Sequence, residues 1–360
     1  MRALINALAG NRLNLLIAAA PISWLLAVQS PDSPWVFITA AISLVPLAGI
    51  IGLGTEELAT RLGPAIGGFL NATFGNAAEL IIAVVALRGG HVELVKASIT
   101  GSIVGNLLLV LGLSFFAGGL GRRSQTFHRT AATNTASMLF LAVVALVMPA
   151  VLELSLYGTL GVPSRVIDRV SLWSAFVLIV AYAGSLIYGF QSHCDLFRSD
   201  DEHKHAASLT QGQAIGVLAA ATVLTTLQAE LLVGALKPAL AQLGLTELFV
   251  GVVLIAIVGN AAEHYSAVVA ARRDQMTLAV EIAVGSSAQI ALLVAPAVVL
   301  YSHVIGHPMS LLFNPFEIVA IALSVLATFL VVVDGESNWV EGLQLMSVYL
   351  ILAIAFYFVP

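Results

Sequence analysis

The five residues Gly75-Asn76-Ala77-Ala78-Glu79 recur as Gly259-Asn260-Ala261-Ala262-Glu263, and both copies stand inside long apolar runs. An ionisable side chain at the centre of a membrane helix costs roughly 2.5–3.5 kcal/mol on insertion scales, and such residues usually mark functional sites. Two acids in matching contexts therefore predict a single ion site, built where two internal repeats meet.

The composition places the chain in a membrane. Of its 360 residues, 59% are hydrophobic and only 10% are charged, whereas soluble proteins carry about 25% charged residues. Windows of about 20 apolar residues predict about eleven helices that span a bilayer, so the expected fold class is an all-α membrane protein. The predicted spans lie near residues 12–29, 35–54, 65–88, 96–120, 131–152, 170–190, 213–236, 246–271, 278–302, 311–333 and 342–359.

The two motifs belong to a longer repeat. The offset from Gly75 to Gly259 is 259 − 75 = 184 residues, and Gly101-Ser102 recurs at the same offset as Gly285-Ser286. This offset covers an odd number of predicted spans, so the two copies cross the bilayer in opposite directions. Inverted repeats with a site near the midplane are a common transporter architecture. The predicted organisation is a first helix in residues 1–30, a five-helix repeat in 31–190, a cytoplasmic linker in 191–212 and a second five-helix repeat in 213–360.

The charged residues and the single cysteine indicate the orientation in the membrane and exclude some partners and sites. With the N-terminus in the cytoplasm, ten of the 15 Lys and Arg residues fall on the inside, in keeping with the positive-inside rule. This predicts a multi-pass protein of a prokaryotic inner membrane, with its C-terminus outside and residues 13–28 retained as a span. A net charge of −5 gives no basic surface for nucleic acid. The one cysteine, Cys194, excludes an internal disulfide and a thiolate zinc site.

The repeated motif carries oxygen ligands on one helix face. Asn76 and Glu79 are three residues apart and so share a face, as do Asn260 and Glu263. Together they offer two carboxylates and two amide oxygens, which suit Ca²⁺ because this ion takes six to eight oxygen ligands. The alternative for each Gly-Asn pair is helix packing, because glycine lets a neighbouring helix approach closely.

The span after each motif adds polar groups. Ser102 and Asn106 are four residues apart and share a face, and Ser286 and Gln289 are three apart and do the same. They are predicted to complete the ligands of a cation or to hydrogen-bond the carboxylates. The alternative is hydrogen bonding between helices without a role in ion binding.

Two carboxylates in a dry site predict how the site works. Like charges that are close together cannot both ionise cheaply, so at least one acid should bind a proton when no cation is present. The same oxygens then accept either a cation or protons. The protein is expected to switch between its inward-facing and outward-facing states only when a cation or protons neutralise the charge of the two carboxylates. Competition for shared ligands is sufficient for exchange.

The motifs resemble those of a known group of transporters. Residues 71–83 are similar to the first α-repeat of the cation/proton exchangers in the calcium/cation antiporter superfamily. Residues 259–264 and 285–292 resemble the second α-repeat. The resemblance implies Ca²⁺/H⁺ antiport, one extra helix plus five and five, an acidic loop between the halves, and Glu79 and Glu263 as the central acids.

The resemblance also suggests secondary residues. His264 follows the second acid in the family pattern and is expected to tune its protonation, the alternative being a packed side chain. Glu56, Glu57 and Glu230 resemble secondary acids of the family, and Glu230 is preferred because it lies deep in an apolar run. Glu56 and Glu57 are alternatively a solvated helix end. The linker 191–212 carries charges of both signs and is interpreted as a solvated loop or as a weak cation sensor.

Several alternatives stay open. A sodium/calcium exchanger is the nearest, although glutamate in both motif copies favours protons as the counter-ion. Mn²⁺, Na⁺ or K⁺ could replace Ca²⁺ because these ions also take oxygen ligands. An intramembrane metallohydrolase would need a motif such as His-Glu-x-x-His, which the sequence lacks. The protein is thus expected to be a transporter and not an enzyme, to use no cofactor and to have the bilayer, Ca²⁺ and H⁺ as partners. A homo-oligomer is left open.

Overall fold

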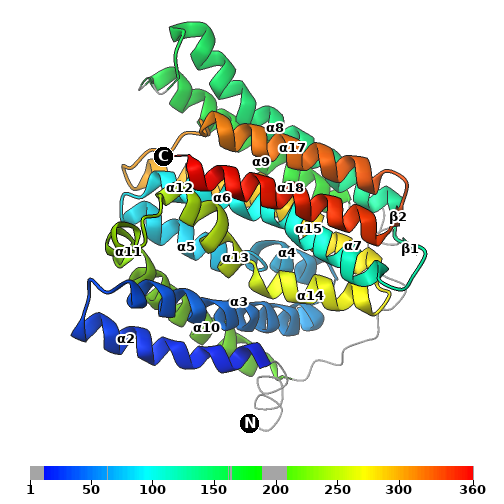
Figure 1. Ribbon diagram of the computed structural model, residues 1–360, viewed down its shortest axis with the longest axis horizontal. Coiled ribbons are helices and arrows are strands. Elements are labelled where there is room, and N and C mark those ends of the chain that lie inside the picture. Colours follow the sequence, from blue (N-terminus) through cyan, green and yellow to red (C-terminus); the bar gives the residue numbers. More distant parts are fainter. Residues whose placement is uncertain (1–11, 63, 161, 163, 189–208, 360) are drawn as a thin grey trace.

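The protein is a bundle of helices with one short two-stranded ribbon (Figure 1). The computed structural model describes residues 12–62, 64–160, 162, 164–188 and 209–359. Up to the central loop the elements are η1 (Arg12–Ala18), α2 (Ala19–Gln29), α3 (Pro34–Leu62), α4 (Pro64–Phe74), α5 (Ala77–Arg88), α6 (Val92–Val104), η2 (Gly105–Val110), α7 (Leu111–Gly119), β1 (Gln125–Thr126), α8 (Arg129–Tyr157) and α9 (Arg165–Ile187). After it come α10 (Gln211–Gly234), α11 (Leu236–Leu243), α12 (Glu247–Phe249), η4 (Val250–Ile255), α13 (Ala256–Gly259), α14 (Ala261–Arg272), α15 (Met276–Gln289), η5 (Ile290–Val294), α16 (Ala295–Val304), α17 (Pro315–Val332), β2 (Glu336–Ser337) and α18 (Trp339–Phe358).

Eight described helices are long and apolar enough to cross a membrane, or nine if the bent pair of α11 and α12–α13 is one span. The eight match the predicted spans that begin near residues 35, 96, 131, 170, 213, 278, 311 and 342. The predicted span 12–29 is a shorter apolar helix, which begins as the 3₁₀ segment η1. The spans 65–88 and 246–271 are each interrupted, so the count of eleven remains a prediction.

Both interruptions fall on the repeated motif. α4 ends at Phe74 and α5 begins at Ala77, while α13 ends at Gly259 and α14 begins at Ala261. The asparagine at each break has nearly the same conformation, with φ −104° and ψ 27° in one copy and φ −93° and ψ 13° in the other. Position 75 requires glycine for a steric reason: a Cβ there would lie 2.5 Å from the carbonyl oxygen of Asn71.

The elements around the two breaks correspond at the offset found in the sequence. α5 and α14 both have 12 residues, and α6 and α15 begin at residues 92 and 276, which are again 184 apart. A π-helical segment follows each of the latter, η2 after α6 and η5 after α15. These matched bounds agree with an internal repeat, and the two five-helix units stay a prediction.

The corresponding elements run in opposite directions. At the end of α5, Arg88 donates to the hydroxyl of Tyr301 near the end of α16. At the other end of the bundle, Arg122 just after α7 donates to the carbonyl of Arg272 at the end of α14. The path α6–α7 therefore ends where α15–α16 begins, and Figure 1 shows α5 and α14 on opposite sides of the centre.

The β1–β2 ribbon marks one end of the bundle. Gln125 pairs with Ser337, and its side-chain amide donates to Asp274 in the turn that precedes α15. Arg122 and Arg272 lie at this end, whereas α18 ends at the opposite end, where the C-terminus is marked in Figure 1.

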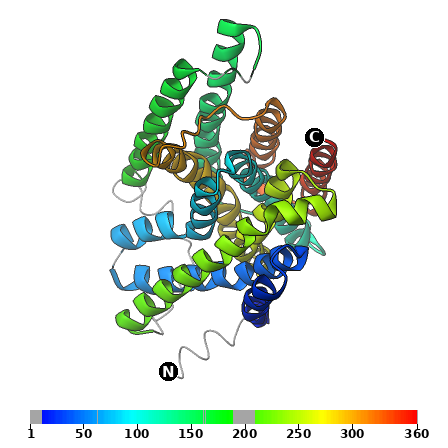
Figure 2. The same cartoon turned by 90° about the vertical axis from the view of Figure 1, so that its left-hand side faces the viewer.

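The core surrounds α6–α7 and α15–α16. The apolar window of α6–α7 is 83% buried and that of α15–α16 is 67% buried, compared with 28% for α8 and 22% for α9. The end of α8 and the start of α9 project beyond the rest of the bundle in both views (Figures 1 and 2), while α8 packs on α15 and α17 and α9 packs on α16. The two helix breaks thus lie against the most protected helices.

Candidate functional site

The helix breaks place both motif acids in the same local setting. Glu79 lies in the first turn of α5, and Glu263 lies in the first turn of α14. The first turn of a helix presents unpaired N–H groups and a partial positive charge, which favours a carboxylate there. Glu79 also lies against Gly259, the first residue of the motif that carries Glu263, so the structure brings the two motifs into one site.

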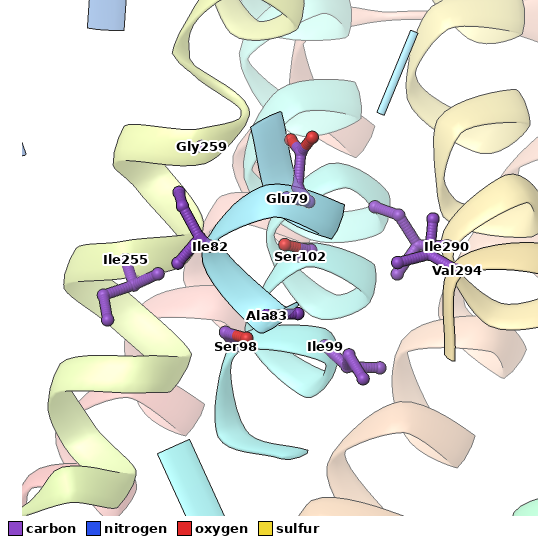
Figure 3. A pocket seen from close by; sticks show the side chains of 10 residues that line it. All are labelled: Glu79, Ile82, Ala83, Ser98, Ile99, Ser102, Ile255, Gly259, Ile290 and Val294. Carbon is purple, nitrogen blue, oxygen red and sulfur yellow. The ribbon is translucent and has the colours of Figure 1, made fainter. Parts of the chain in front are cut away.

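Glu79 is packed against the other motif. A Cβ at Gly259 would lie 3.4 Å from Oε1 of Glu79, so the absent side chain leaves room for the carboxylate. Figure 3 shows Glu79 beside a small chamber that is otherwise largely apolar, with Ser102 as a polar neighbour and Ile82 and Ile255 among its walls. The chamber has a volume of about 10 Å³, which is close to the space that one water molecule needs.

Amide groups link the two motifs to the helices that follow the opposite motif. Asn76 donates to Oε1 of Gln289 at 2.5 Å. Asn260 donates to the hydroxyl of Ser102 at 2.9 Å and accepts from Asn106 at 3.1 Å. Five of the predicted polar residues therefore pair across the two halves of the chain, in an arrangement that periodicity along one helix does not reveal.

The site contains buried oxygens that accept no hydrogen bond. Within the described residues these are both carboxylate oxygens of Glu79, Oε2 of Glu263, and the Oδ1 atoms of Asn76 and Asn106. Buried polar atoms normally have partners, so a group of unsatisfied acceptors requires an explanation. All five are acceptors, and either protons on the carboxyls or a cation could satisfy them.

A second and larger cavity, of about 680 Å³, lies on the other side of the site. Glu263, Ser286 and Gln289 line it at its inner end. Tyr265 and Leu278 also line it and are 52% and 38% exposed, so the cavity reaches the surface. Because α14 ends and α15 begins beside the β1–β2 ribbon, the cavity extends from the site toward that end of the bundle.

The three predicted secondary acids, Glu56, Glu57 and Glu230, lie in three different environments. Glu56 is exposed and lines the large cavity. Glu57 is buried and accepts a hydrogen bond from the backbone of Leu209. α3 extends to Leu62, beyond the predicted end near residue 54, so both Glu56 and Glu57 lie within the helix. Glu230 is exposed near the end of α10 and lines neither cavity.

The predictions for His264, for the acid of α10 and for the linker 191–212 can also be compared with the structure. His264 is half-buried beside Glu263 and lines neither cavity. Glu230 is exposed, whereas Gln228, two residues earlier in α10, is fully buried and accepts a hydrogen bond from Ser23. Most of the linker 191–212 lies outside the described residues. In the part of the chain that the structure describes, no three His, Cys, Asp or Glu side chains converge to hold a metal.

Glu281, which is absent from the predicted site, lines the large cavity with one buried oxygen that accepts no hydrogen bond. A signal was present, because residues 278, 281 or 282, 285 or 286 and 289 fall on one helix face. Ser286 and Gln289, which were predicted, share this face with Glu281, which lies nearer the start of α15.

Comparisons with known proteins agree with this geometry. The chain matches the family described as sodium/calcium exchanger protein over residues 32–191 and 213–358. It is 44% identical over 342 residues to the Ca²⁺/H⁺ antiporter of Synechocystis sp., covering 90% of this chain and 91% of that protein. It is 41% identical over 346 residues to the Ca²⁺/H⁺ antiporter of Aphanothece halophytica, covering 91% of each.

Solved structures extend the match to the fold. Native YfkE aligns with a TM-score of 0.83 at 38% identity, covering 96% of this chain and 100% of that one. The sodium–calcium exchanger NCX_Mj has a TM-score of 0.55 at 16% identity, covering 88% of this chain and 98% of that one, and shares the fold. On these grounds the chain belongs to the sodium/calcium exchanger protein family.

Proposed function

We propose that this protein is a Ca²⁺/H⁺ antiporter, a secondary transporter that exchanges the divalent cation for protons at the site between α5 and α14. The observation that carries the proposal is the buried carboxylate oxygens of Glu79 and Glu263 that accept no hydrogen bond, accompanied by the unpartnered amide oxygens of Asn76 and Asn106. The printed function of relatives at 41% and 44% identity supports the same reaction. Ca²⁺ and H⁺ are the transported substrates, and no cofactor takes part.

The oxygens explain why the two ions compete. Two carboxylates balance the charge of one Ca²⁺, and the amide oxygens of Asn76 and Asn106 add neutral ligands of the kind that this ion takes. When the cation leaves, two carboxylates in adjacent motifs repel each other, which favours a proton on at least one of them. Cation and protons therefore occupy the same groups in turn, which couples their movements.

The two cavities suggest which way the site faces. The large cavity leads from Glu263 toward the β1–β2 end, which carries Arg122 and Arg272 and is the cytoplasmic end under the positive-inside rule. The chamber beside Glu79 is closed by apolar side chains. In the second half of the cycle the large cavity closes and a path opens beside Glu79, and the opposite directions of α5 and α14 support such alternation in an inverted repeat.

The topology proposed here has the N-terminus in the cytoplasm and the C-terminus outside, in a multi-pass membrane protein. A first helix in residues 1–30 precedes five-helix repeats in 31–190 and 213–360, joined by the linker 191–212. A reporter fused after Pro360 tests the orientation, because it is expected on the outer side of the membrane. Activity of the reporter in the cytoplasm would contradict the topology.

The reaction is tested in everted membrane vesicles with an imposed pH gradient. Ca²⁺ is expected to collapse the gradient in the wild-type protein, and parallel additions of Mn²⁺, Na⁺ and K⁺ identify the transported cation. Glu79→Gln and Glu263→Gln are each expected to abolish the response. Glu336→Gln, which removes an exposed carboxylate of β2, serves as the charge-matched control. Full Ca²⁺-driven proton movement in either site variant would contradict the shared-ligand scheme.

A further inference from the structure

Glu281 is an acid that the repeated motifs do not account for. Its side chain lines the large cavity, and its Oε1 is buried and accepts no hydrogen bond. The corresponding position at the offset of 184 is 281 − 184 = 97, which is a fully buried alanine, Ala97. This acid therefore belongs to one half of the chain only, and the exchange scheme above does not use it.

Glu281 stands between the site and the surface. Leu278, Glu281, Ile282, Ser286 and Gln289 form a stripe along one face of α15 that lines the large cavity. Gln289, at the inner end of the stripe, accepts the hydrogen bond from the motif amide. Glu281 is eight residues closer to the start of the helix, which places it about 12 Å along the axis toward the β1–β2 end.

The large cavity carries negative charge only. Its described lining includes Glu56, Glu263 and Glu281 and contains no Lys, Arg or His. Walls of low dielectric focus the field of such charges and raise the local concentration of cations. Glu56 is exposed, and water weakens its attraction for an ion. Glu281 offers a shielded oxygen, and the next unpartnered carboxylate oxygen along the cavity is Oε2 of Glu263.

We propose that Glu281 captures the divalent cation that arrives from the β1–β2 end and delivers it to Glu263. This inference rests on the proposed function. Glu281 lies outside the group of oxygens that holds the ion at the helix breaks. Its main effect is therefore to lower the KM for Ca²⁺ that enters from the β1–β2 end. A unit charge at about 12 Å, the axial separation of Glu281 from Gln289, changes the affinity for a divalent ion about threefold at the dielectric constant of water when little salt screens it.

The first experiment measures Ca²⁺-dependent proton movement in everted vesicles that contain the full-length protein. Glu281→Gln is expected to raise the KM for Ca²⁺ about threefold at low ionic strength while the maximal rate at saturating Ca²⁺ is retained. Glu281→Asp keeps the charge and is expected to stay close to the wild-type KM, and Glu336→Gln is the control for a lost surface charge. An unchanged KM in Glu281→Gln, or a loss of maximal rate without a change in KM, would overturn the inference.

A second experiment separates the charge from the shape of the side chain. Glu281→Cys is prepared in a Cys194→Ser background, since Cys194 is the single cysteine of the sequence. A membrane-impermeant thiosulfonate that carries a sulfonate is expected to lower the KM of this variant, and one that carries a trimethylammonium group to raise it. Both should act only from the β1–β2 side.

Equal effects of the two reagents would indicate a purely structural role and reject the capture step. If the wild-type protein itself moves no protons in response to Ca²⁺, the proposed function fails before Glu281 is tested. The two failures are therefore distinguishable.

Discussion

Gly259→Ala is expected to make the protein more stable and less active. Gly259 is the last residue of α13 and does not have a positive φ, so alanine fits the backbone. Replacing glycine by alanine in a compatible conformation stabilises a protein by about 0.4–1 kcal/mol. The new methyl group would lie 3.4 Å from Oε1 of Glu79, an ordinary contact that needs no rearrangement. The same methyl would fill space that a cation or its water needs, because the chamber there measures only about 10 Å³.

The expected size of the functional effect follows from the lost ligand. A cation bound to Glu79 approaches its oxygens to about 2.3–2.6 Å and needs further oxygen ligands around it. Exclusion of one such ligand at a cost of about 1.4 kcal/mol raises the KM for Ca²⁺ about tenfold.

The assay is the pH-gradient measurement in everted vesicles, combined with thermal unfolding of the purified protein. Gly285→Ala is the matched control, since a Cβ at this position in α15 meets nothing within 4 Å. The control should gain a similar stability and keep the wild-type KM. Wild-type KM in Gly259→Ala would show that the space beside Glu79 is not used by the ion.

Further outcomes are expected from the same structure. Gly101→Ala should destabilise the protein by about 1–3 kcal/mol, measured by thermal unfolding, because its Cβ would collide with the backbone of Val252. Asn260→Ala should cost roughly 2 kcal/mol through the loss of three hydrogen bonds at about 0.6 kcal/mol each, and a variant as stable as the wild type would contradict the observed pairing. The KM for Ca²⁺ should fall as the pH on the cavity side rises, because fewer protons then compete for the carboxylates; a pH-independent KM would exclude competition. Glu230→Gln should retain the wild-type KM, because this side chain is exposed and lines neither cavity.

The sequence is sufficient to predict a membrane protein and to select Glu79 and Glu263 as the central acids, because both predictions depend on patterns of neighbouring residues. Apolar runs of about 20 residues reveal spans, and a buried acid repeated at a fixed offset stands out against them. The pairing of Asn76 with Gln289 could not be predicted in this way, since these residues are 213 positions apart. Periodicity identifies the residues on one face of a helix and says nothing about which helix that face meets.

Burial within a membrane protein is equally difficult to read from an apolar run. Glu230 lies deep in such a run, yet it is exposed, while the polar residue two positions earlier, Gln228, is fully buried. Side chains that face lipid are as apolar as those that face the core, so hydropathy alone cannot separate them. The same ambiguity hid Glu281, whose importance depends on a cavity formed by α3, α14 and α15.

The amide pairs across the helix breaks keep the same chemistry while their positions have drifted. At the offset of 184, Gln289 corresponds to Gly105, and Asn106 corresponds to Ile290. The partner amide has thus moved by one residue, about 100° around the helix, and in one half the longer glutamine side chain makes up the difference. Combining Gln289→Gly with Ile290→Asn would place the same two residues at these positions as Gly105 and Asn106 in the first half, so that each motif asparagine could meet an asparagine at the matching place.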